Sequence, residues 1–236
     1  MTDLEDGGEA VLGITGTWHT LHASGVEWRH HARLLEAFEI GTTPPPGSSG
    51  ESVRISSSSG SPGPDEGNQP WSIWIERPTL KRAEFMVGDE SVIVIFHGHT
   101  WWSWSPSRGA HDNIGRIRDT HGLGPSTGLL ETQLLSRSLH LKELSRGTML
   151  GRDVIHLRGS PRATITGHDH FRMMQALHPI GLGADEYRFA LDAQQGVLLR
   201  SEARRANRPF LVLEMTEVRF DEHFDADMFA PESLSM

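Results

Sequence analysis

DEYRFALDAQQGVLLRSEARRANRPFLVLEMTEVRF, residues 185–220, contains the pattern of three consecutive β-strands. Tyr187, Phe189 and Leu191 occupy alternate positions, the period of two that is typical of a sheet with one buried face. A turn is expected at 193–196 and a break near Asn207. The expected strands cover residues 185–192, 197–203 and 210–220. Such a meander favours a binding surface, and no catalytic signature lies within it.

Earlier parts of the chain repeat this pattern about every ten residues, with proline or glycine between the segments. Residues 92–96 are apolar at every position, so both faces of that strand should be covered. Two short helices are also expected, the second capped by Ser126 or Thr127. The expected strands lie within 11–31 and over 70–77, 80–87, 92–96, 101–105, 139–144 and 152–158, and the helices over 32–40 and 128–138.

Residues 42–69 differ from the rest because proline, serine and glycine dominate them. Such a segment buries too little apolar surface to offset the entropy lost on ordering, so it is predicted to be a flexible insert, within which residues 53–55 could still form an edge strand. The 236 residues otherwise suffice for one domain with a genuine core, and we expect a single domain over 1–236.

Composition excludes several classes of protein. The formal net charge of −9 argues against a nucleic-acid partner, which requires clustered positive charge. The absence of cysteine excludes disulfides, thiolate metal sites and cysteine nucleophiles. The acidic start lacks the features of a secretory signal, and no apolar run approaches a membrane span. As written, the chain is expected to be a cytoplasmic monomer, or periplasmic or otherwise extracytoplasmic if a leader was removed.

Four segments, in this order, resemble the bacterial LolA-like and LolB-like lipoprotein carriers. They are IERP with KRAE at 75–84, the strand–turn–strand ending in WSWSP at 92–106, LDAQQGVLLR at 191–200, and the phenylalanine-containing acidic tail at 218–229. The resemblance covers roughly residues 70–230 and extends to sensor domains with the same fold.

The resemblance implies an α+β fold. An antiparallel sheet of about ten or eleven strands would curve into an incomplete β-barrel, with a few short helices plugging its open side. The concave face would then hold an acyl chain or a similar apolar ligand. A half-barrel interior that side chains leave unfilled is an apolar pocket with a few polar markers.

Aromatic and sulfur-containing side chains are the candidate ligand contacts. Strand alternation places Trp71 opposite Trp74, and Trp101 opposite Trp102 and Trp104, so each set should contribute a side chain to the interior. Met173 and Met174 belong to a short helix or loop whose thioethers adapt to variable ligands, although simple packing explains them equally well. The predicted ligand-binding residues are Trp74, Phe96, Trp102, Trp104, Met173, Met174, Phe189, Leu213 and Met215.

Histidine pairs are the only pattern that suggests a metal. His97 with His99, or His168 with His170, would share one face of a strand, and His30 and His31 are adjacent. Nothing in the sequence supplies the further ligands, so no metal and no cofactor are expected. A nucleophile elbow and a nucleotide-binding loop are also missing, which leaves no predicted catalytic residue.

The leading hypothesis is a non-enzymatic binding or carrier protein for a lipid or another apolar small molecule. Each buried CH2 of such a ligand contributes about 0.8 kcal/mol before ordering costs. One alternative is an enzyme of specialised metabolism that folds an apolar substrate in the same pocket, with histidine as acid or base. Another is a sensor or protein-interaction domain, related to those that bind anti-sigma factors, whose sheet edge recruits a peptide.

Overall fold

A computed structural model describes residues 16–43, 66–114, 122–130, 132, 135–162 and 168–235. It contains one antiparallel sheet of eleven strands. The strands are β1 (Thr20–His30), β2 (Glu66–Glu76), β3 (Leu80–Val87), β4 (Glu90–His97), β5 (Thr100–Ser105), β6 (Gly109–Asp112), β7 (Leu139–Met149), β8 (Arg152–Pro161), β9 (Glu186–Asp192), β10 (Leu198–Arg205) and β11 (Arg208–Phe220).

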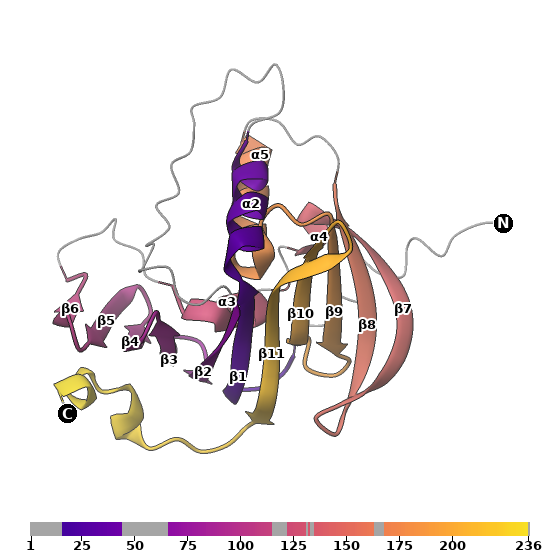
Figure 1. The fold of residues 1–236 in the computed structure, drawn as a ribbon. Coiled ribbons are helices and arrows are strands. Elements are labelled where there is room, and N and C mark those ends of the chain that lie inside the picture. The colour runs from indigo at the N-terminus through magenta and orange to yellow at the C-terminus, as the bar shows by residue number, and fades with distance from the viewer. Residues whose placement is uncertain are drawn as a thin grey trace. The chain divides into compact units, whose positions relative to one another are not determined.

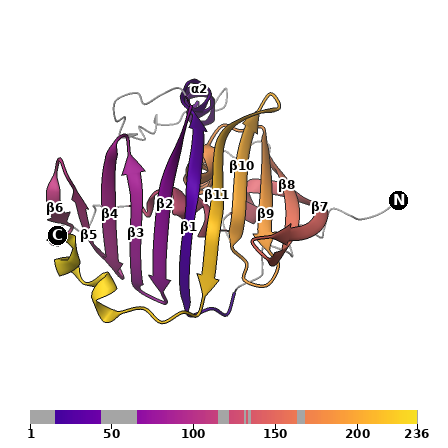
Figure 2. The same ribbon diagram turned by 60° about the horizontal axis from the view of Figure 1, so that its bottom comes forward.

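The strand order in the sheet is β6-β5-β4-β3-β2-β1-β11-β10-β9-β8-β7 (Figure 2). Strands β6 and β7 occupy the two ends, and among the described strands they do not pair with each other, so the sheet is open. This confirms the predicted α+β class and the number of strands. The three strands predicted from residues 185–220 appear as β9, β10 and β11.

Helices are few and short. They are α2 (His31–Thr42), α3 (Thr127–Leu130), α4 (Leu135–Ser138) and α5 (His168–Gly181), with 3-10 turns η1 (Gly124–Ser126), η3 (Ala226–Phe229) and η4 (Pro231–Ser235). Figure 1 shows α2 and α5 side by side, in agreement with their contacts. Within the described part of the chain, none of the helices has the length and apolar character needed to span a bilayer.

The chain divides into two compact units. Unit 1 consists of residues 1–16, 27–68 and 128–214, and unit 2 of residues 17–26, 69–127 and 215–236. Strands β1, β2 and β11 contribute residues to both. The expectation of one domain over 1–236 stays a prediction. Most of the predicted flexible insert, residues 44–65, lies outside the described residues, and β2 begins at Glu66, earlier than the expected position 70.

In unit 1, helix α5 packs against β10, α2 and α4. The loop after α5 approaches α2 so closely that a Cβ at Gly183 would lie 1.8 Å from the Ala37 carbonyl oxygen. Tyr187, which is fully buried on β9, donates a hydrogen bond of 2.8 Å to the carbonyl of Gly181. These contacts fix the end of α5 over the sheet of this unit.

In unit 2, strand β4 is covered on both faces, as its apolar sequence predicted. Val94 and Ile95 point to opposite faces and both have no exposed surface. Ile95 belongs to a cluster that the C-terminal tail, residues 221–235, supplies with Phe224, Phe229 and Leu234. The tail is therefore anchored by apolar side chains, while Asp225 is exposed, as expected for a solvated acidic segment.

Two local predictions were wrong. The helix expected over 128–138 is interrupted: α3 ends at Leu130 and α4 starts at Leu135. Neither expected cap is formed: the Ser126 hydroxyl donates to the Leu123 carbonyl at 2.8 Å, and Thr127 Oγ1 is buried without a hydrogen-bond partner among the described residues. Serine hydroxyls compete in this way for nearby backbone groups, which is why position alone did not identify the cap.

Candidate functional site: apolar layers with unpaired polar groups

A cross-strand row in unit 1 brings together two of the predicted ligand residues. In register, Leu157 pairs with Phe189, Phe189 with Ser201, and Ser201 with Leu213. All four are almost completely buried. Directly paired residues of a sheet point to the same face, so Phe189 and Leu213 flank the Ser201 side chain in one apolar layer.

Ser201 is the unusual member of this row. Its hydroxyl is buried and finds no hydrogen-bond partner in the structure as described. A buried polar group left without a partner costs about 1–3 kcal/mol, and such groups require an explanation. Sequence reasoning missed Ser201, although a signal existed: it is the polar residue between Leu199 and Ala203 on the buried side of β10.

Helix α5 covers β10 and carries the two predicted methionines. Met174 is buried together with Leu177 and Ile180, whereas Met173 is half-buried. The short helix or loop expected here is a helix of 14 residues that contains Pro179 near its end. Burial lowers the pKa of His178 in its last turn, which favours the neutral imidazole beside Phe38.

A second apolar layer in unit 2 contains Trp71 and Phe96. Trp71 pairs in register with Phe85, and Phe96 with Trp101. The Trp71 indole Nε1 is buried and, like the Ser201 hydroxyl, finds no hydrogen-bond partner among the described residues. Turn η1 covers this layer, since a Cβ at Gly124 would lie 2.6 Å from the Phe85 ring.

Three predicted ligand residues lie on the opposite face of unit 2. Trp74, Trp102 and Trp104 are half-buried and pack against Ile95 and the C-terminal tail. The predicted set of aromatic residues is thus divided between two faces, with Phe96 on one and these tryptophans on the other. Met215, the last predicted residue, is buried on the part of β11 that belongs to unit 2.

Polar contacts hold the tail over this tryptophan face. The Arg82 guanidinium donates 2.9 Å hydrogen bonds to the Met228 carbonyl and the Ser233 hydroxyl. His97 Nε2 lies 2.8 Å from the Phe229 carbonyl oxygen. The face therefore accommodates a peptide segment through both apolar anchors and backbone contacts.

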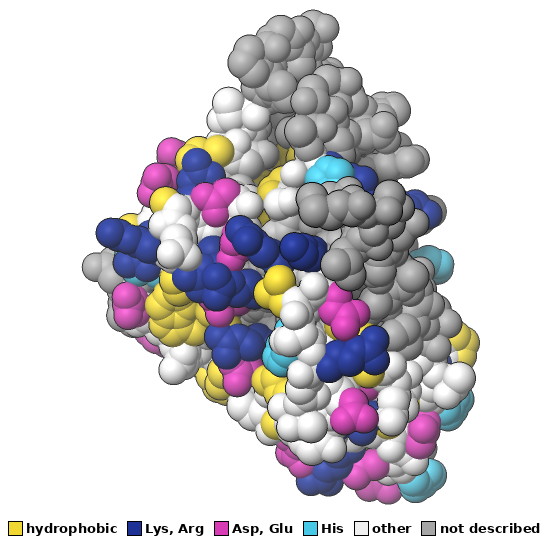
Figure 3. Space-filling view, turned by 90° about the vertical axis from the view of Figure 1, so that its right-hand side faces the viewer, with side chains coloured by type: hydrophobic (Ala, Val, Ile, Leu, Met, Phe, Trp, Pro, Cys, Tyr) yellow, Lys and Arg dark blue, Asp and Glu magenta, His cyan; other side chains and the backbone are white. Residues whose placement is uncertain are grey.

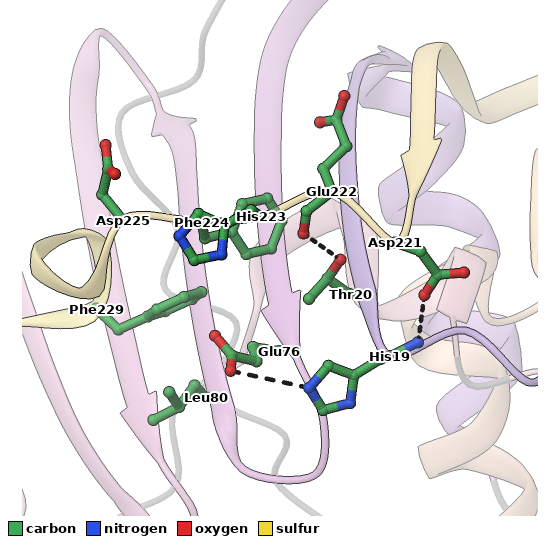
Figure 4. A pocket seen from close by; sticks show the side chains of 10 residues that line it. All are labelled: His19, Thr20, Glu76, Leu80, Asp221, Glu222, His223, Phe224, Asp225 and Phe229. Carbon is green, nitrogen blue, oxygen red and sulfur yellow. Dashed lines mark hydrogen bonds and ion pairs between the residues drawn. The ribbon is translucent and has the colours of Figure 1, made fainter.

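An open pocket of about 680 Å³ lies in unit 2 where the tail leaves β11 (Figure 4). Phe224, Phe229 and Leu80 supply its apolar side. Some of the polar lining residues contact one another. Asp221 accepts a 2.7 Å hydrogen bond from the His19 amide, and His19 Nε2 lies 3.9 Å from Glu76. Its other lining residues are Thr20, Glu222, His223 and Asp225.

The histidine pairs do not assemble a metal centre in the described part of the chain, where no three metal-ligating side chains converge. His97 contacts the tail, and His30 caps α2 by accepting from the Arg33 amide at 3.5 Å. His22 stacks on Trp74 with ring centroids 5.0 Å apart, and burial lowers its pKa despite the carboxylates of Glu217 and Glu222. The side chains of His168 and His170 lie outside the description.

Comparisons with known proteins identify the fold but not a family at the level of sequence. No protein family and no curated protein matches the chain. Among solved structures, MucB matches with a TM-score of 0.50 and 10% identity over 93% of this chain and 60% of its own. The complex of Pseudomonas aeruginosa MucA and MucB matches with a TM-score of 0.47 and 13% identity over 89% and 54%, respectively.

The lipoprotein LppX of Mycobacterium tuberculosis matches with a TM-score of 0.44 and 12% identity, over 89% of this chain and 91% of its own. A LolA-superfamily protein of Nitrosomonas europaea is also found. The chain spans little more than half the length of the MucB structures that it matches. The match with MucB shows that the chain shares the fold of that protein.

Proposed function

We propose that this chain binds an apolar ligand that carries a hydrogen-bond acceptor, such as an acyl chain ending in a carboxylate or ester. The observation that carries the proposal is the Ser201 hydroxyl, buried without a partner between Phe189 and Leu213. An apolar layer with a few polar groups at defined places is the usual composition of a small-molecule site.

The unpaired Ser201 hydroxyl gives an energetic reason for the layer under α5 to open to a ligand. The unpaired hydroxyl weakens the closed arrangement, because a buried donor without an acceptor costs about 1–3 kcal/mol. A ligand that inserts under α5 replaces the helix's apolar contacts with its own and supplies the missing acceptor. Met173 and Met174 on α5 have the flexibility to repack around such a guest.

The Trp71 layer of unit 2 repeats the same chemistry. There the unpaired donor is the indole Nε1, and Phe85 and Phe96 supply apolar surface. Phe96 remains a proposed ligand contact in this layer, and Met215 remains one by its burial on β11. Trp74, Trp102 and Trp104 would contact a ligand only after the tail moves, because the tail packs on them.

The test compares Ser201→Ala with the unchanged protein for binding of a fluorescent fatty acid. Affinity should fall by about tenfold, the worth of one hydrogen bond to a charged group. Stability should stay equal or rise, because the variant removes an unsatisfied group. Thr132→Ala is the matched control: its buried hydroxyl already donates a 3.1 Å hydrogen bond to the Gly196 carbonyl, so this variant should lose stability and keep its affinity.

Native material gives an independent readout. Protein purified without detergent should release an apolar compound into organic solvent, identifiable by mass spectrometry. If no such compound is found and the fatty acid fails to bind saturably, the proposal is wrong. Unchanged affinity in Ser201→Ala would instead remove Ser201 from the site.

A second candidate function is peptide recognition on the tryptophan face of unit 2. It is favoured by the chain's own tail, which inserts Phe224, Phe229 and Leu234 there and bonds to Arg82 through its backbone. A partner segment with similarly spaced apolar residues would displace the tail. Deletion of residues 222–236 should then increase binding of a synthetic peptide of that sequence; no binding would exclude this function.

A further inference from the structure

Strand β7 forms one end of the sheet, and among the described residues nothing pairs with its outer edge. Its even-numbered residues and the turn that follows are all exposed, and none of them is acidic. We name this set the edge ridge; it comprises His140, Lys142, Leu144, Arg146, Thr148 and Leu150. Leu144 is 54% exposed and Leu150 41%, which places two large apolar side chains in water beside basic ones.

Besides being exposed, Leu150 has an unfavourable backbone conformation. It has φ of +53°, followed by Gly151 at +72°, the conformation of a two-residue hairpin turn in which asparagine and glycine are preferred. The left-handed conformation costs a residue such as leucine roughly 1–2 kcal/mol. A strained and exposed leucine at a hairpin tip is a conformational outlier of the kind that points to function.

Charge on this hairpin is opposite to that of the whole chain. Residues 139–161 contain four arginine or lysine residues and two acidic residues, in a chain of net charge −9. Lys142 pairs in register with Arg158, and Arg158 with Arg188, so three cations stand side by side on one face. Directly opposed like charges destabilise a sheet. Glu186 forms ion pairs with both arginines and offsets this only in part.

Figure 3 shows Lys and Arg side chains gathered on this side of the molecule. The distant acidic residues do not cancel their field, because charges more than about 8 Å apart are largely screened at physiological ionic strength. The 3.1 Å pair between Arg146 and Glu143 is exposed, and exposed pairs contribute little. Because the pairing register shifts between Glu143 and Ser145, Lys142 and Arg158 lie on one face of the sheet and Arg146 lies on the other. The edge strand therefore carries cations on both faces, together with exposed leucine.

Two partners have complementary chemistry: an acidic peptide added as a further strand, and a bilayer with anionic lipids. The register of β7 shifts between Glu143 and Ser145, which makes a bulge at Leu144. A bulge interrupts the hydrogen-bonding edge that an added strand requires. A bilayer needs no such edge; it binds basic residues electrostatically and accommodates apolar side chains at the interface.

We propose that the edge ridge docks this protein onto an anionic lipid bilayer. The edge of the sheet meets the bilayer: Leu144 and Leu150 enter the interface, while Lys142 and Arg158 from one face and Arg146 from the other contact lipid headgroups. This surface is separate from the proposed ligand layer, so the proposal does not depend on Ser201 or on any bound ligand.

Co-sedimentation of the full chain with vesicles tests the proposal. Binding should be strong for phosphatidylcholine vesicles with about 30% phosphatidylglycerol, weak for phosphatidylcholine alone, and should decrease with rising NaCl. Lys142→Gln and Arg146→Gln should each lower the partition coefficient about fivefold. Leu150→Asn should lower it by a similar factor, because a partly buried leucine side chain is lost from the interface.

Leu150→Asn also separates docking from misfolding, because asparagine tolerates the left-handed conformation and should preserve or raise thermal stability. Ile114→Asn is the matched control: Ile114 is 64% exposed but belongs to unit 2 and is not part of the ridge, and its loss should leave binding unchanged. Equal binding to both vesicle types, or equal losses in the two asparagine variants, would overturn the proposal.

Competition with a soluble polyanion distinguishes a bilayer from an acidic protein partner. Polyglutamate should compete only weakly with vesicles for the protein. The Leu150→Asn variant should bind polyglutamate as well as the unchanged protein does. Tight polyglutamate binding with no vesicle binding would assign the basic row to an acidic protein partner and overturn membrane docking.

Discussion

Glu27 and Arg29 lie two residues apart on β1 and form a 2.7 Å ion pair in which the carboxylate is buried. Burial raises the pKa of Glu27 above its usual range, and the neighbouring Arg29 reduces this effect without reversing it. Desolvation therefore outweighs the ion pair in setting the protonation of this side chain.

This relationship predicts a particular dependence of stability on pH. A carboxyl whose pKa is raised in the folded state binds its proton more tightly there, so its contribution is full below the unfolded pKa and is lost as pH rises through the folded value. Glu27→Gln should thus gain stability relative to the unchanged protein as the pH rises above the ordinary glutamate pKa of about 4.3. Urea unfolding at pH values below and above this pKa measures the difference, and a constant difference would contradict the prediction.

Gly183 should tolerate no side chain. Its φ is +87°, and a Cβ there would lie 1.8 Å from the Ala37 carbonyl oxygen. Gly183→Ala should reduce the free energy of unfolding by about 3 kcal/mol or more, because the backbone of α2 must move. Gly88 is the control, with φ of +62° and open space around it. Gly88→Ala should cost only about 1 kcal/mol, and equal costs in thermal melts would disprove the steric argument.

Asp192 should be essential for the turn between β9 and β10. It is fully buried, and its Oδ1 accepts hydrogen bonds from the Gln194 and Gln195 amides at 2.9 and 2.8 Å. Its Oδ2 forms an ion pair with Arg152. Asp192→Ala should cost about 3–5 kcal/mol, the penalty for breaking a buried pair.

Asp192→Asn distinguishes the two contributions, because the amide oxygen still accepts the turn hydrogen bonds while the ion pair is lost. Chemical denaturation should place this variant between the alanine variant and the unchanged protein. If Asn and Ala are equally destabilised, the turn hydrogen bonds do not contribute.

Phe229 should control access to the tryptophan face. It is 3% exposed in the cluster with Ile95, so Phe229→Ala removes the central anchor of the tail. Because the tail ends the chain, it should detach locally before the sheet unfolds, and the global loss should stay below the roughly 3–5 kcal/mol of a core Phe→Ala change. Tryptophan emission should shift to the red as Trp102 and Trp104 meet water.

The control for this prediction is Asp227→Ala, since Asp227 is exposed on the same turn. It should leave both emission and stability unchanged. A similar red shift in both variants would mean that the tail is held by its backbone contacts with Arg82 and His97 rather than by Phe229.

Local patterns determined much of this protein. Alternation along β9 predicted that Tyr187, Phe189 and Leu191 share a buried face, and the apolar run of β4 predicted burial on both faces; both were confirmed. These results follow from the period of two, which any strand obeys regardless of its neighbours. The order of segments also resembled that of a fold with one antiparallel sheet of about ten or eleven strands, and the described residues form such a sheet of eleven strands.

Only the tertiary structure decided what covers each face. Sequence alternation separated Trp71 from Trp74, but it contained no information that a tail 150 residues later would pack on Trp74 and leave Trp71 under η1. The environment of Ser201 was also decided by tertiary structure, because cross-strand register places this residue between Phe189 and Leu213. Burial and hydrogen-bond satisfaction depend on partners distant in sequence, and these are chosen when the whole chain folds.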